Sequence, residues 1–386
     1  MTEGCVLCGK CLEVCPLLAA TGREELSPRA KANLVQLLGR DPNALSEQDA
    51  ATLAGFCLGC GRCKDACSQG VDVPGAVSRL RNAHPGWKAW VWKQWMERSK
   101  ALWPKAGKAA RVIPEGLAPG RLSGLLKLAR GLGREPIAPC VRVESFPDSL
   151  RGTEALLFSG CTASGAAPHW TTAGEAICDG LGLVRINAAF SCCGSGLATA
   201  GLLDERLEAA RRNVEIWRSA GRPLLVAFCA SCTLGLAGYA ETPALAGELF
   251  QDQAEAGQWA GSLTPLSSLL NSARFVVSQG APQGTGYHRP CHLQGPDPDE
   301  TLVRGMLGDR ELAISKDCCG FGGILQLGAP TLSAQVASRC WKKLAPAPGT
   351  LVLTGCSACV LQLSATAPEG IQTAHWLEAI ATNDRR

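Results

Sequence analysis

The spacing of the cysteines constrains the fold of this chain more than any other feature of its sequence. Of 386 residues, 21 are cysteines, and 18 of these fall into four groups. Two groups repeat the pattern C-x2-C-x2-C-x3-C, which presents three sulfurs from one tight turn and so suits an inorganic core. Gly9 and Gly61 give these turns the backbone freedom that they need. The eight cysteines are Cys5, Cys8, Cys11 and Cys15 in the first run, and Cys57, Cys60, Cys63 and Cys67 in the second.

The spacing of the two runs resembles that of bacterial ferredoxins, where the fourth thiolate of each run binds the neighbouring cluster. It predicts two [4Fe-4S] cubane clusters with crossed ligands. Pro16 follows the first run as in that pattern, whereas Ser68 takes the place of proline after the second. We expect one cluster to be held by Cys5, Cys8, Cys11 and Cys67, and the other by Cys57, Cys60, Cys63 and Cys15.

Two other interpretations of the runs are structural zinc and a disulfide framework. Zinc sites usually place two close cysteine pairs far apart, rather than four ligands in one short run. Disulfides require an oxidising compartment, and the amino terminus MTEGCVLC has neither the basic nor the apolar region of a secretory signal. Iron is therefore the predicted metal.

The other ten grouped cysteines form two sets of five in the same order, which indicates an internal duplication. Each set contains a single cysteine, an adjacent pair within a CCG sequence, and a C-x-x-C pair. Adjacent cysteines make a poor mutual disulfide, because the bond geometry fits badly across one peptide link, so both can face one metal site. The first set is Cys161, Cys192, Cys193, Cys229 and Cys232, and the second is Cys291, Cys318, Cys319, Cys356 and Cys359.

With these residues the chain resembles a known family. The repeated element is similar to the cysteine-rich CCG domain of the B and D subunits of heterodisulfide reductase, of the iron-sulfur subunit of glycolate oxidase, of related lactate-oxidation proteins, and of membrane redox complexes of anaerobic respiration. The resemblance extends over nearly the whole chain. It includes the order of two ferredoxin-type runs and then two CCG domains, and the stretches CGKCLEVCP, SPRA and CSQGVDVP.

The resemblance implies that each five-cysteine set binds a noncubane [4Fe-4S] cluster, as in heterodisulfide reductase. Some relatives carry fewer clusters than cysteine sets, and the gap between Cys291 and Cys318 is shorter than the gap between Cys161 and Cys192. We therefore expect one or two further clusters, cubane or noncubane, beside the two ferredoxin-type cubanes.

The sequence predicts an α/β fold with parallel sheets in two repeated CCG domains, preceded by a mostly helical ferredoxin-type domain. The apolar runs EALLFSG, PLLVAF and GTLVLTG each lead into a grouped cysteine, as expected for buried parallel strands with functional groups at their carboxyl ends. Helical patterns over 203–217 and 332–344 lie between such strands. The expected division is residues 1–84 for the ferredoxin-type domain, 85–150 for a Trp-rich, basic helical connector, and 151–272 and 273–386 for the CCG domains.

Composition argues against some classes of function. The net charge of +4 comes from mixed signs with no long basic block, so no nucleic-acid partner is expected. No run of eighteen apolar residues occurs, so any membrane contact must be peripheral. In the connector, five tryptophans beside lysine and arginine suit either packing against the cluster domains or docking at a membrane or partner helix. These are Trp87, Trp90, Trp92, Trp95 and Trp103. We expect a cytoplasmic protein, peripheral on the cytoplasmic face of the inner membrane.

A few residues outside the sets carry weaker expectations. Cys178 and Cys340 lie in apolar helical patterns, where a free cysteine is usually a small buried hydrophobe. His288 and His292 flank Cys291. They could tune a cluster or pass a proton, and the alternative is a hydrogen bond that orients the loop.

Two functions are compatible with the sequence. The first is an iron-sulfur electron-transfer subunit of a multi-subunit, membrane-associated respiratory oxidoreductase, relaying electrons between ferredoxin-type and CCG clusters. Because no GxGxxG follows a strand and no Walker lysine is present, flavin or nucleotide chemistry would belong to a flavoprotein, cytochrome or membrane quinone-reactive partner. The alternative is a catalytic heterodisulfide (thiol-disulfide) reductase subunit that acts on a thiol or disulfide substrate. No catalytic residue can be named from the sequence.

Overall fold

Helices build the amino-terminal part of the chain, as expected. The computed structural model describes residues 4–114, 123–190, 192–293 and 295–382. Ser27 and Ser46 cap two of the first helices by accepting a hydrogen bond from the backbone N–H of Ala30 and Asp49, and Pro28 starts one of them. The elements are α1 (Lys10–Glu13), α2 (Pro16–Thr21), η1 (Glu24–Leu26), α3 (Pro28–Arg40), α4 (Glu47–Gly55), α5 (Arg62–Asp65) and α6 (Val73–Ala83).

Two parallel sheets of four strands each follow, which confirms the predicted fold class. Their strand orders are β3-β2-β4-β5 and β10-β9-β7-β8, and every pairing within them is parallel. Reversed, the second order is β8-β7-β9-β10, so the two sheets repeat one topology, in agreement with an internal duplication. The strands are β2 (Glu154–Phe158), β3 (Val184–Arg185), β4 (Leu224–Ala227) and β5 (Leu263–Pro265), then β7 (Thr285–His288), β8 (Leu312–Ser315), β9 (Leu351–Thr354) and β10 (Gln372–His375).

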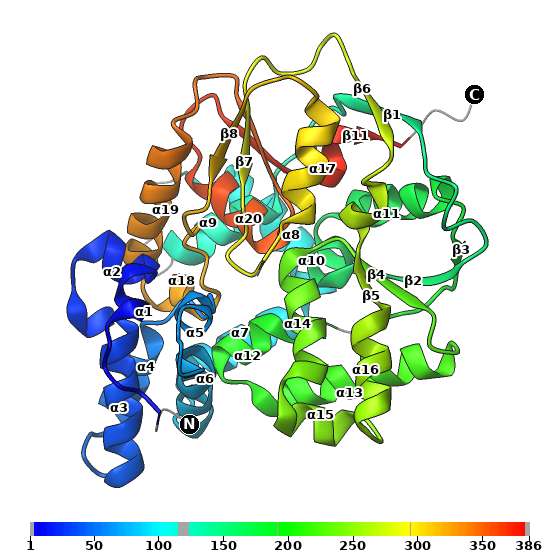
Figure 1. Cartoon of the computed structure of the whole chain (residues 1–386). Helices are drawn as coiled ribbons and strands as arrows, with labels where there is room; N and C mark the ends of the chain where they lie inside the picture. The colour runs from blue at the N-terminus through cyan, green and yellow to red at the C-terminus, as the bar shows by residue number, and fades with distance from the viewer. Residues whose placement is uncertain (1–3, 115–122, 191, 294, 383–386) are drawn as a thin grey trace.

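Helices connect the strands of each sheet and cover them (Figure 1). Around the first sheet these are α10 (Gly160–Gly165), α11 (Pro168–Gly180), α12 (Ser195–Ala200), α13 (Leu203–Ser219), α14 (Ala230–Glu241), α15 (Pro243–Leu249), α16 (Gln253–Ser262) and η3 (Leu266–Leu270). Around the second they are α17 (Pro298–Leu307), α18 (Ile324–Gly328), α19 (Pro330–Leu344), α20 (Ser357–Thr366) and α21 (Trp376–Ala379).

The connector is helical only in part. It contains α7 (Trp87–Glu97), α8 (Ser99–Val112) and α9 (Ser123–Leu132), and α9 packs against both α8 and α20. It then forms a strand, β1 (Val141–Ser145), which pairs with β11 (Ile380–Ala381) and with β6 (Arg274–Val277) in a small third sheet. The sequence did not predict this strand, because both of its partners lie far away along the chain.

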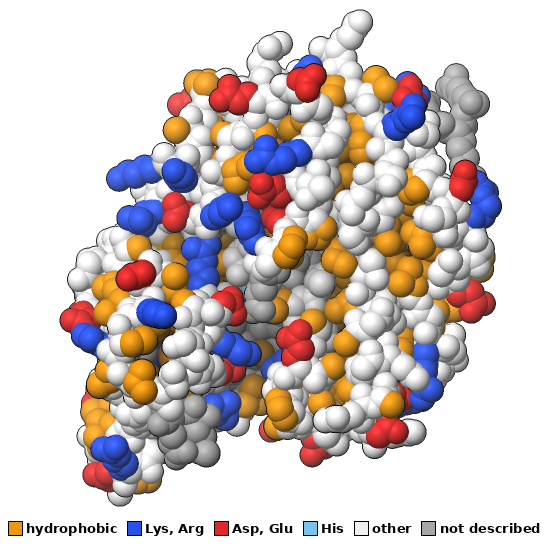
Figure 2. All heavy atoms as spheres, viewed as in Figure 1, with side chains coloured by type: hydrophobic (Ala, Val, Ile, Leu, Met, Phe, Trp, Pro, Cys, Tyr) orange, Lys and Arg blue, Asp and Glu red, His pale blue; other side chains and the backbone are white. Residues whose placement is uncertain are grey.

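The two large sheets share one apolar core. Leu156 and Leu225 from the first sheet belong to the same buried cluster as Val352 and Leu353 from the second. The N-terminal helices form a separate lobe beside this core, and Figure 2 shows the surface hollowed between the two. None of the helices in the described part of the chain combines the length and the hydropathy needed to cross a bilayer.

Candidate metal centre

The two ferredoxin-type loops have the same local geometry. Gly9 and Gly61, each directly after the second cysteine of its run, have φ angles of 83° and 81°. These left-handed conformations, which glycine adopts without strain, turn the chain into the short helices α1 and α5. The two short helices contact one another, so the runs face each other as the predicted crossed arrangement requires.

The fourth cysteine of the first run lies with the second run. A small cavity of about 370 Å³ is lined by four thiols, those of Cys57, Cys60, Cys63 and Cys15. Burial, together with the neighbouring charges of Cys57 and Cys15, raises the pKa of Cys63 to about 12. This is the set that we expect to bind the second cubane.

The fourth cysteine of the second run correspondingly lies with the first run. The pKa of Cys11 is raised by burial and then by the charges of Cys5, Cys8 and Cys67. The backbone N–H of Val71 donates to Cys67 Sγ over 3.4 Å, and the N–H of Gly59 donates to Cys57 Sγ over 3.4 Å in the second run. Amide N–H groups commonly donate to the cysteine sulfurs of iron-sulfur clusters. The described geometry therefore supports crossed ligation, which stays a proposal.

All ten cysteines of the five-cysteine sets lie beyond the carboxyl ends of parallel strands, where α/β sheets usually place their sites. In each unit the single cysteine follows the first strand, the adjacent pair follows the second strand, and the C-x-x-C pair follows the third strand and starts a helix. In the first unit these are Cys161 after β2, Cys192 and Cys193 before α12, and Cys229 and Cys232 at the start of α14. In the second they are Cys291 after β7, Cys318 and Cys319 before α18, and Cys356 and Cys359 at the start of α20.

The two sets adjoin each other, which the sequence did not predict. Cys229 Sγ of the first set lies 3.2 Å from Ser231 Oγ and 3.2 Å from Ser357 Oγ, and the backbone N–H of Ser357 donates to it over 3.3 Å. In return, Cys356 Sγ of the second set lies 3.5 Å from Ser231 Oγ. The serine within each C-x-x-C pair thus contacts a sulfur of the other set. Both pairs contain a serine, at the third position of CASC and the second of CSAC, and this was the only signal that the sequence offered.

Hydrogen bonds favour the thiolate form of the first cysteine of each adjacent pair. The pKa of Cys192 and that of Cys318 are well below the ordinary range, because the single cysteine of each set donates a hydrogen bond to the sulfur and the second cysteine of the pair adds another. The backbone N–H of Gly194 and of Gly320 also donates to these sulfurs, over 3.4 Å in both cases.

Glycines leave room for the sulfurs of the first set. A Cβ atom on Gly160 would lie 2.8 Å from Cys232 Sγ, and one on Gly235 would lie 3.1 Å from Cys193 Sγ. The cysteine sulfurs and the amide donors, together with glycines that leave room for a bulky group, fit an iron-sulfur cluster.

The second five-cysteine set adjoins the second ferredoxin-type set, by which we mean the crossed ligand set Cys57, Cys60, Cys63 and Cys15. The thiols of Cys60 and Cys318 interact electrostatically, and so do those of Cys60 and Cys291. Cys60 and Cys291 pack against the same small apolar cluster, which contains Cys318 and Leu58. Cysteine sulfurs therefore continue from the amino-terminal lobe into the α/β part without a long interruption.

A cavity lies between the two five-cysteine sets. It contains about 980 Å³ of empty space, part of it open to solvent, and cysteines from both sets line it. Aromatic and apolar side chains form another part of its wall. Among its described lining residues none is Asp, Glu, Lys or Arg. The wall residues include Trp92, Trp95, Trp103, Phe321 and Leu361.

Three of the five connector tryptophans thus pack against the site. Trp92 and Trp103 are buried, and their indole N–H groups donate to the carbonyl oxygens of Gly196 and Trp95, over 3.0 Å in both cases. Trp87 and Trp90 are 63% and 65% exposed. Packing against the site therefore explains Trp92, Trp95 and Trp103. It does not explain Trp87 and Trp90.

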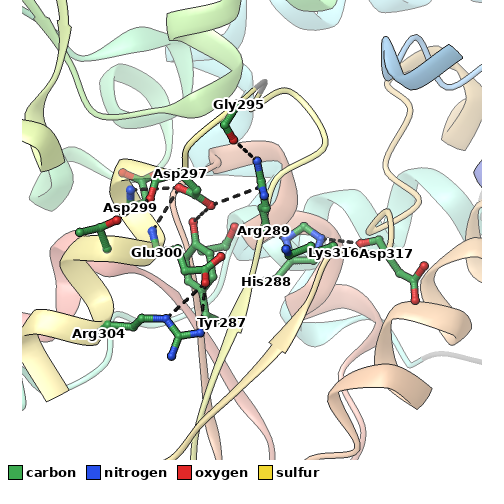
Figure 3. Close-up of polar contacts among 12 residues, drawn as sticks. Tyr287, His288, Arg289, Gly295, Asp297, Asp299, Glu300, Arg304, Lys316 and Asp317 are labelled. Carbon is green, nitrogen blue, oxygen red and sulfur yellow. Dashed lines mark hydrogen bonds and ion pairs between the residues drawn. The ribbon is translucent and has the colours of Figure 1, made fainter. Parts of the chain in front are cut away.

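Polar contacts fix the loop that follows β7 and presents Cys291 (Figure 3). The Tyr287 hydroxyl donates to Asp297 Oδ2 over 2.8 Å, and Asp297 also caps α17 by accepting from the N–H groups of Asp299 and Glu300. Arg289 reaches the same carboxylate at 3.9 Å. These bonds fasten both ends of the loop to the second sheet.

His288 belongs to the same scaffold. Its Nδ1 lies 3.3 Å from Thr354 Oγ1 and its Nε2 lies 3.0 Å from the Asp317 carbonyl oxygen, so both ring nitrogens have partners. One of its nitrogens lies within 4.8 Å of the sulfurs of Cys319 and Cys359, which are themselves 3.3 Å apart. Burial lowers the pKa of His288 to about 4, so it is neutral. These contacts favour the loop-orienting alternative.

Two of the three cysteines outside the sets are buried in helices. Cys178 in α11 and Cys340 in α19 are fully buried, and burial raises the pKa of each to about 12. Both therefore fit the predicted role of a small apolar residue.

The chain is similar to several redox proteins. Residues 1–71 match the family described as a 4Fe-4S dicluster domain, and residues 155–237 and 285–364 each match the cysteine-rich domain family. The D subunit of the dihydromethanophenazine:CoB–CoM heterodisulfide reductase of Methanosarcina acetivorans is 23% identical, over 92% of this chain and 87% of its own length. The B subunit of the fumarate reductase (CoM/CoB) of Methanothermobacter marburgensis is 21% identical, over 94% of this chain and 67% of its own. Lactate utilization protein A of an Exiguobacterium species is 26% identical, over 39% of this chain and 63% of its own.

Proposed function

We propose that this chain, which belongs to the CCG-domain iron-sulfur proteins, is the subunit of a multi-subunit oxidoreductase in which a disulfide is reduced between the two five-cysteine sets. The observation that carries the proposal is the apolar surface that shares one cavity with sulfurs of both sets. Clusters bound by these sulfurs would fill part of the cavity, whereas Trp92, Trp95 and Phe321 offer a surface to a substrate, which a pure relay does not need. This surface supports the second of the two functions that the sequence left open.

Electrons would enter at the amino-terminal lobe. Cys8 is exposed and offers a partner access to the first ferredoxin-type set. From there the sulfurs continue through Cys11 and Cys63 to Cys60, and then to Cys318. Iron-sulfur clusters held by the two ferredoxin-type sets and by one or both five-cysteine sets would supply single electrons along this path.

The cavity residues would orient the substrate and keep water out. Reduction breaks the S–S bond, and each sulfur takes up one electron and one proton, so that two thiols leave; the electrons come from a redox partner and the protons from solvent. Trp92, Trp95 and Phe321 provide apolar surface for the groups next to the disulfide. Because the described lining has no charged side chain other than thiolates, the part of the substrate inside the cavity should be uncharged.

The test is disulfide-dependent oxidation of reduced viologen by anaerobically purified protein. Cys193→Ala, which changes a cavity residue, should abolish the activity. Cys178→Ala removes a buried cysteine outside the sets and should retain both iron and activity. If protein with its full iron content failed to reduce any disulfide in a panel, only the relay function would remain.

The relay is the second candidate, and the similarity to fumarate reductase and lactate utilization proteins favours it. In that case the organic chemistry takes place in a flavoprotein, cytochrome or membrane quinone-reactive partner. Purification of an intact complex that reduces no disulfide but passes electrons from such a partner to a dye would support it.

We also propose a peripheral location on the cytoplasmic face of the inner membrane, supported by the exposed indoles of Trp87 and Trp90 on α7. Indole rings favour the bilayer interface. Trp87→Ala combined with Trp90→Ala should reduce co-sedimentation with lipid vesicles, whereas Leu37→Ala, which removes an exposed apolar residue elsewhere, should not. Equal sedimentation of all variants would contradict this location.

A further inference from the structure

Two cations are buried in the amino-terminal lobe without a carboxylate beside them in the described residues. Lys31 on α3 is only 4% exposed and Arg81 on α6 only 7%. Among the described residues, neither side chain forms an ion pair. Every hydrogen bond that the two side chains donate there goes to a backbone carbonyl. The acceptors are Leu26 and Ser27 for Lys31, and Ala54, Gly55, Cys57 and Thr199 for Arg81.

Both cations face the second ferredoxin-type set. Lys31 lines the cavity that the four thiols of this set share. Burial lowers the pKa of Lys31, and the charges of Cys57, Cys15 and Cys63 oppose that shift. Burial likewise lowers the pKa of Arg81, and the charge of Cys57 opposes it.

A buried cation is costly unless a negative group lies close to it. Carbonyl dipoles satisfy the N–H groups of Lys31 and Arg81 but do not neutralise their charge. The thiols of the second set are the acidic groups that act on both side chains. A [4Fe-4S] core bound by four thiolates carries a net negative charge in both of its oxidation states, so a cluster in this cavity would supply the missing counter-charge.

The first ferredoxin-type set differs in the charge beside it. The pKa of Cys11 is raised by burial and by the charges of Cys5, Cys8 and Cys67, so its main electrostatic partners are other cysteines and not a buried cation. Lys10, between Cys8 and Cys11, is exposed, so water and salt screen its charge. The two sets therefore share one cysteine spacing, but the described buried cations lie beside the second set.

We propose that Lys31 and Arg81 raise the reduction potential of the second ferredoxin-type cluster above that of the first, and so direct electrons inward from the exposed loop toward Cys60 and the five-cysteine sets. Reduction adds one negative charge to a cluster, and an adjacent buried cation favours that charge. The inference rests on the proposed crossed ligation by Cys15, Cys57, Cys60 and Cys63. It does not depend on disulfide reduction.

The test is an EPR-monitored redox titration of the full chain, prepared without oxygen. Cys8→Ser identifies the signal of the first cluster by its loss or change. Lys31→Met removes the charge and keeps the length of the side chain, whereas Lys31→Arg keeps the charge. Lys10→Met removes an exposed lysine beside the first set and is the matched control.

We expect Lys31→Met to shift the midpoint potential of the second cluster in the negative direction and to leave the first unchanged. Lys31→Arg should restore the second potential, and Lys10→Met should have little effect on either. If Lys31→Met destabilised the fold and left both potentials unchanged, Lys31 would only cap carbonyl groups, and the proposal would be wrong.

A second measurement covers the case in which Lys31→Met fails to assemble the second cluster. In the unmodified chain, the separation between the two potentials should persist at high salt, because buried charges are screened little. Loss of that separation at high salt, or a second cluster with the lower potential, would overturn the proposal. Disulfide reduction enters neither measurement, so the failure of the proposed function would remain distinguishable.

Discussion

Substitution of Gly320 should destabilise the protein more than substitution of Gly349, although both glycines have a φ of 83°. Alanine at either position costs about 1–2 kcal/mol for the left-handed conformation. At position 320 the new Cβ would lie 2.3 Å from the Ser333 carbonyl oxygen and 3.0 Å from the Ala337 nitrogen, both in the backbone of α19. At position 349 nothing in the described chain lies within 4 Å.

The extra contact at Gly320 resembles overpacking of a core, which costs about 1–3 kcal/mol. The expected loss of unfolding free energy is therefore about 2–5 kcal/mol for Gly320→Ala and about 1–2 kcal/mol for Gly349→Ala. Because Gly320 directly follows Cys318 and Cys319, its variant should also lose iron from the second five-cysteine set, whereas Gly349→Ala should not.

Urea unfolding of anaerobically prepared protein, together with iron analysis, measures both effects. Equal unfolding free energies and full iron content in both variants would refute the close approach of α19 to the loop that carries the cysteine pair.

Two further predictions concern single side chains, and a third concerns the clusters as a whole. Trp92→Phe removes the hydrogen bond to Gly196 and should cost about 1 kcal/mol in urea unfolding, whereas Trp90→Phe, on the exposed face of α7, should be neutral. Asp297→Ala removes the cap of α17 and the acceptor of Tyr287, and a loss of about 1–3 kcal/mol is expected; a neutral effect would contradict the network in Figure 3. Removal of iron by a chelator should lower the melting temperature by calorimetry, because the thiolates and cations around the clusters lose their counter-charges; an unchanged melting temperature would argue that the sets do not bind metal in the folded chain.

The sequence predicted the parts of the site that depend on local spacing. Tight cysteine runs, glycines in left-handed turns, and cysteines after buried strands are all set within a few residues, and they are found at Gly9, Gly61 and beyond β2, β4 and β9. The α/β class with two repeated parallel sheets was confirmed for the same reason. The proposed division at residues 84, 150 and 272 stays a prediction.

Features that depend on distant packing were not predictable. The contact between Ser231 and Cys356 joins the two repeats, and the strand β1 exists only because β6 and β11 lie beside it. Similarly, the spacing of Trp92 and Trp103 in the sequence does not show that both side chains line the same cavity. Each of these contacts is decided by how the repeats pack, and repeats of equal sequence pattern can pack in several ways.

The most direct test of the account is EPR spectroscopy of reduced, anaerobically purified protein with and without a disulfide substrate. We predict that the disulfide perturbs the signal of the five-cysteine sets, that Cys193→Ala abolishes this change, and that the ferredoxin-type signals stay the same. If the disulfide left every signal unaltered, or if residues 151–386 held no iron, the cavity between the two sets would not be the site of reduction.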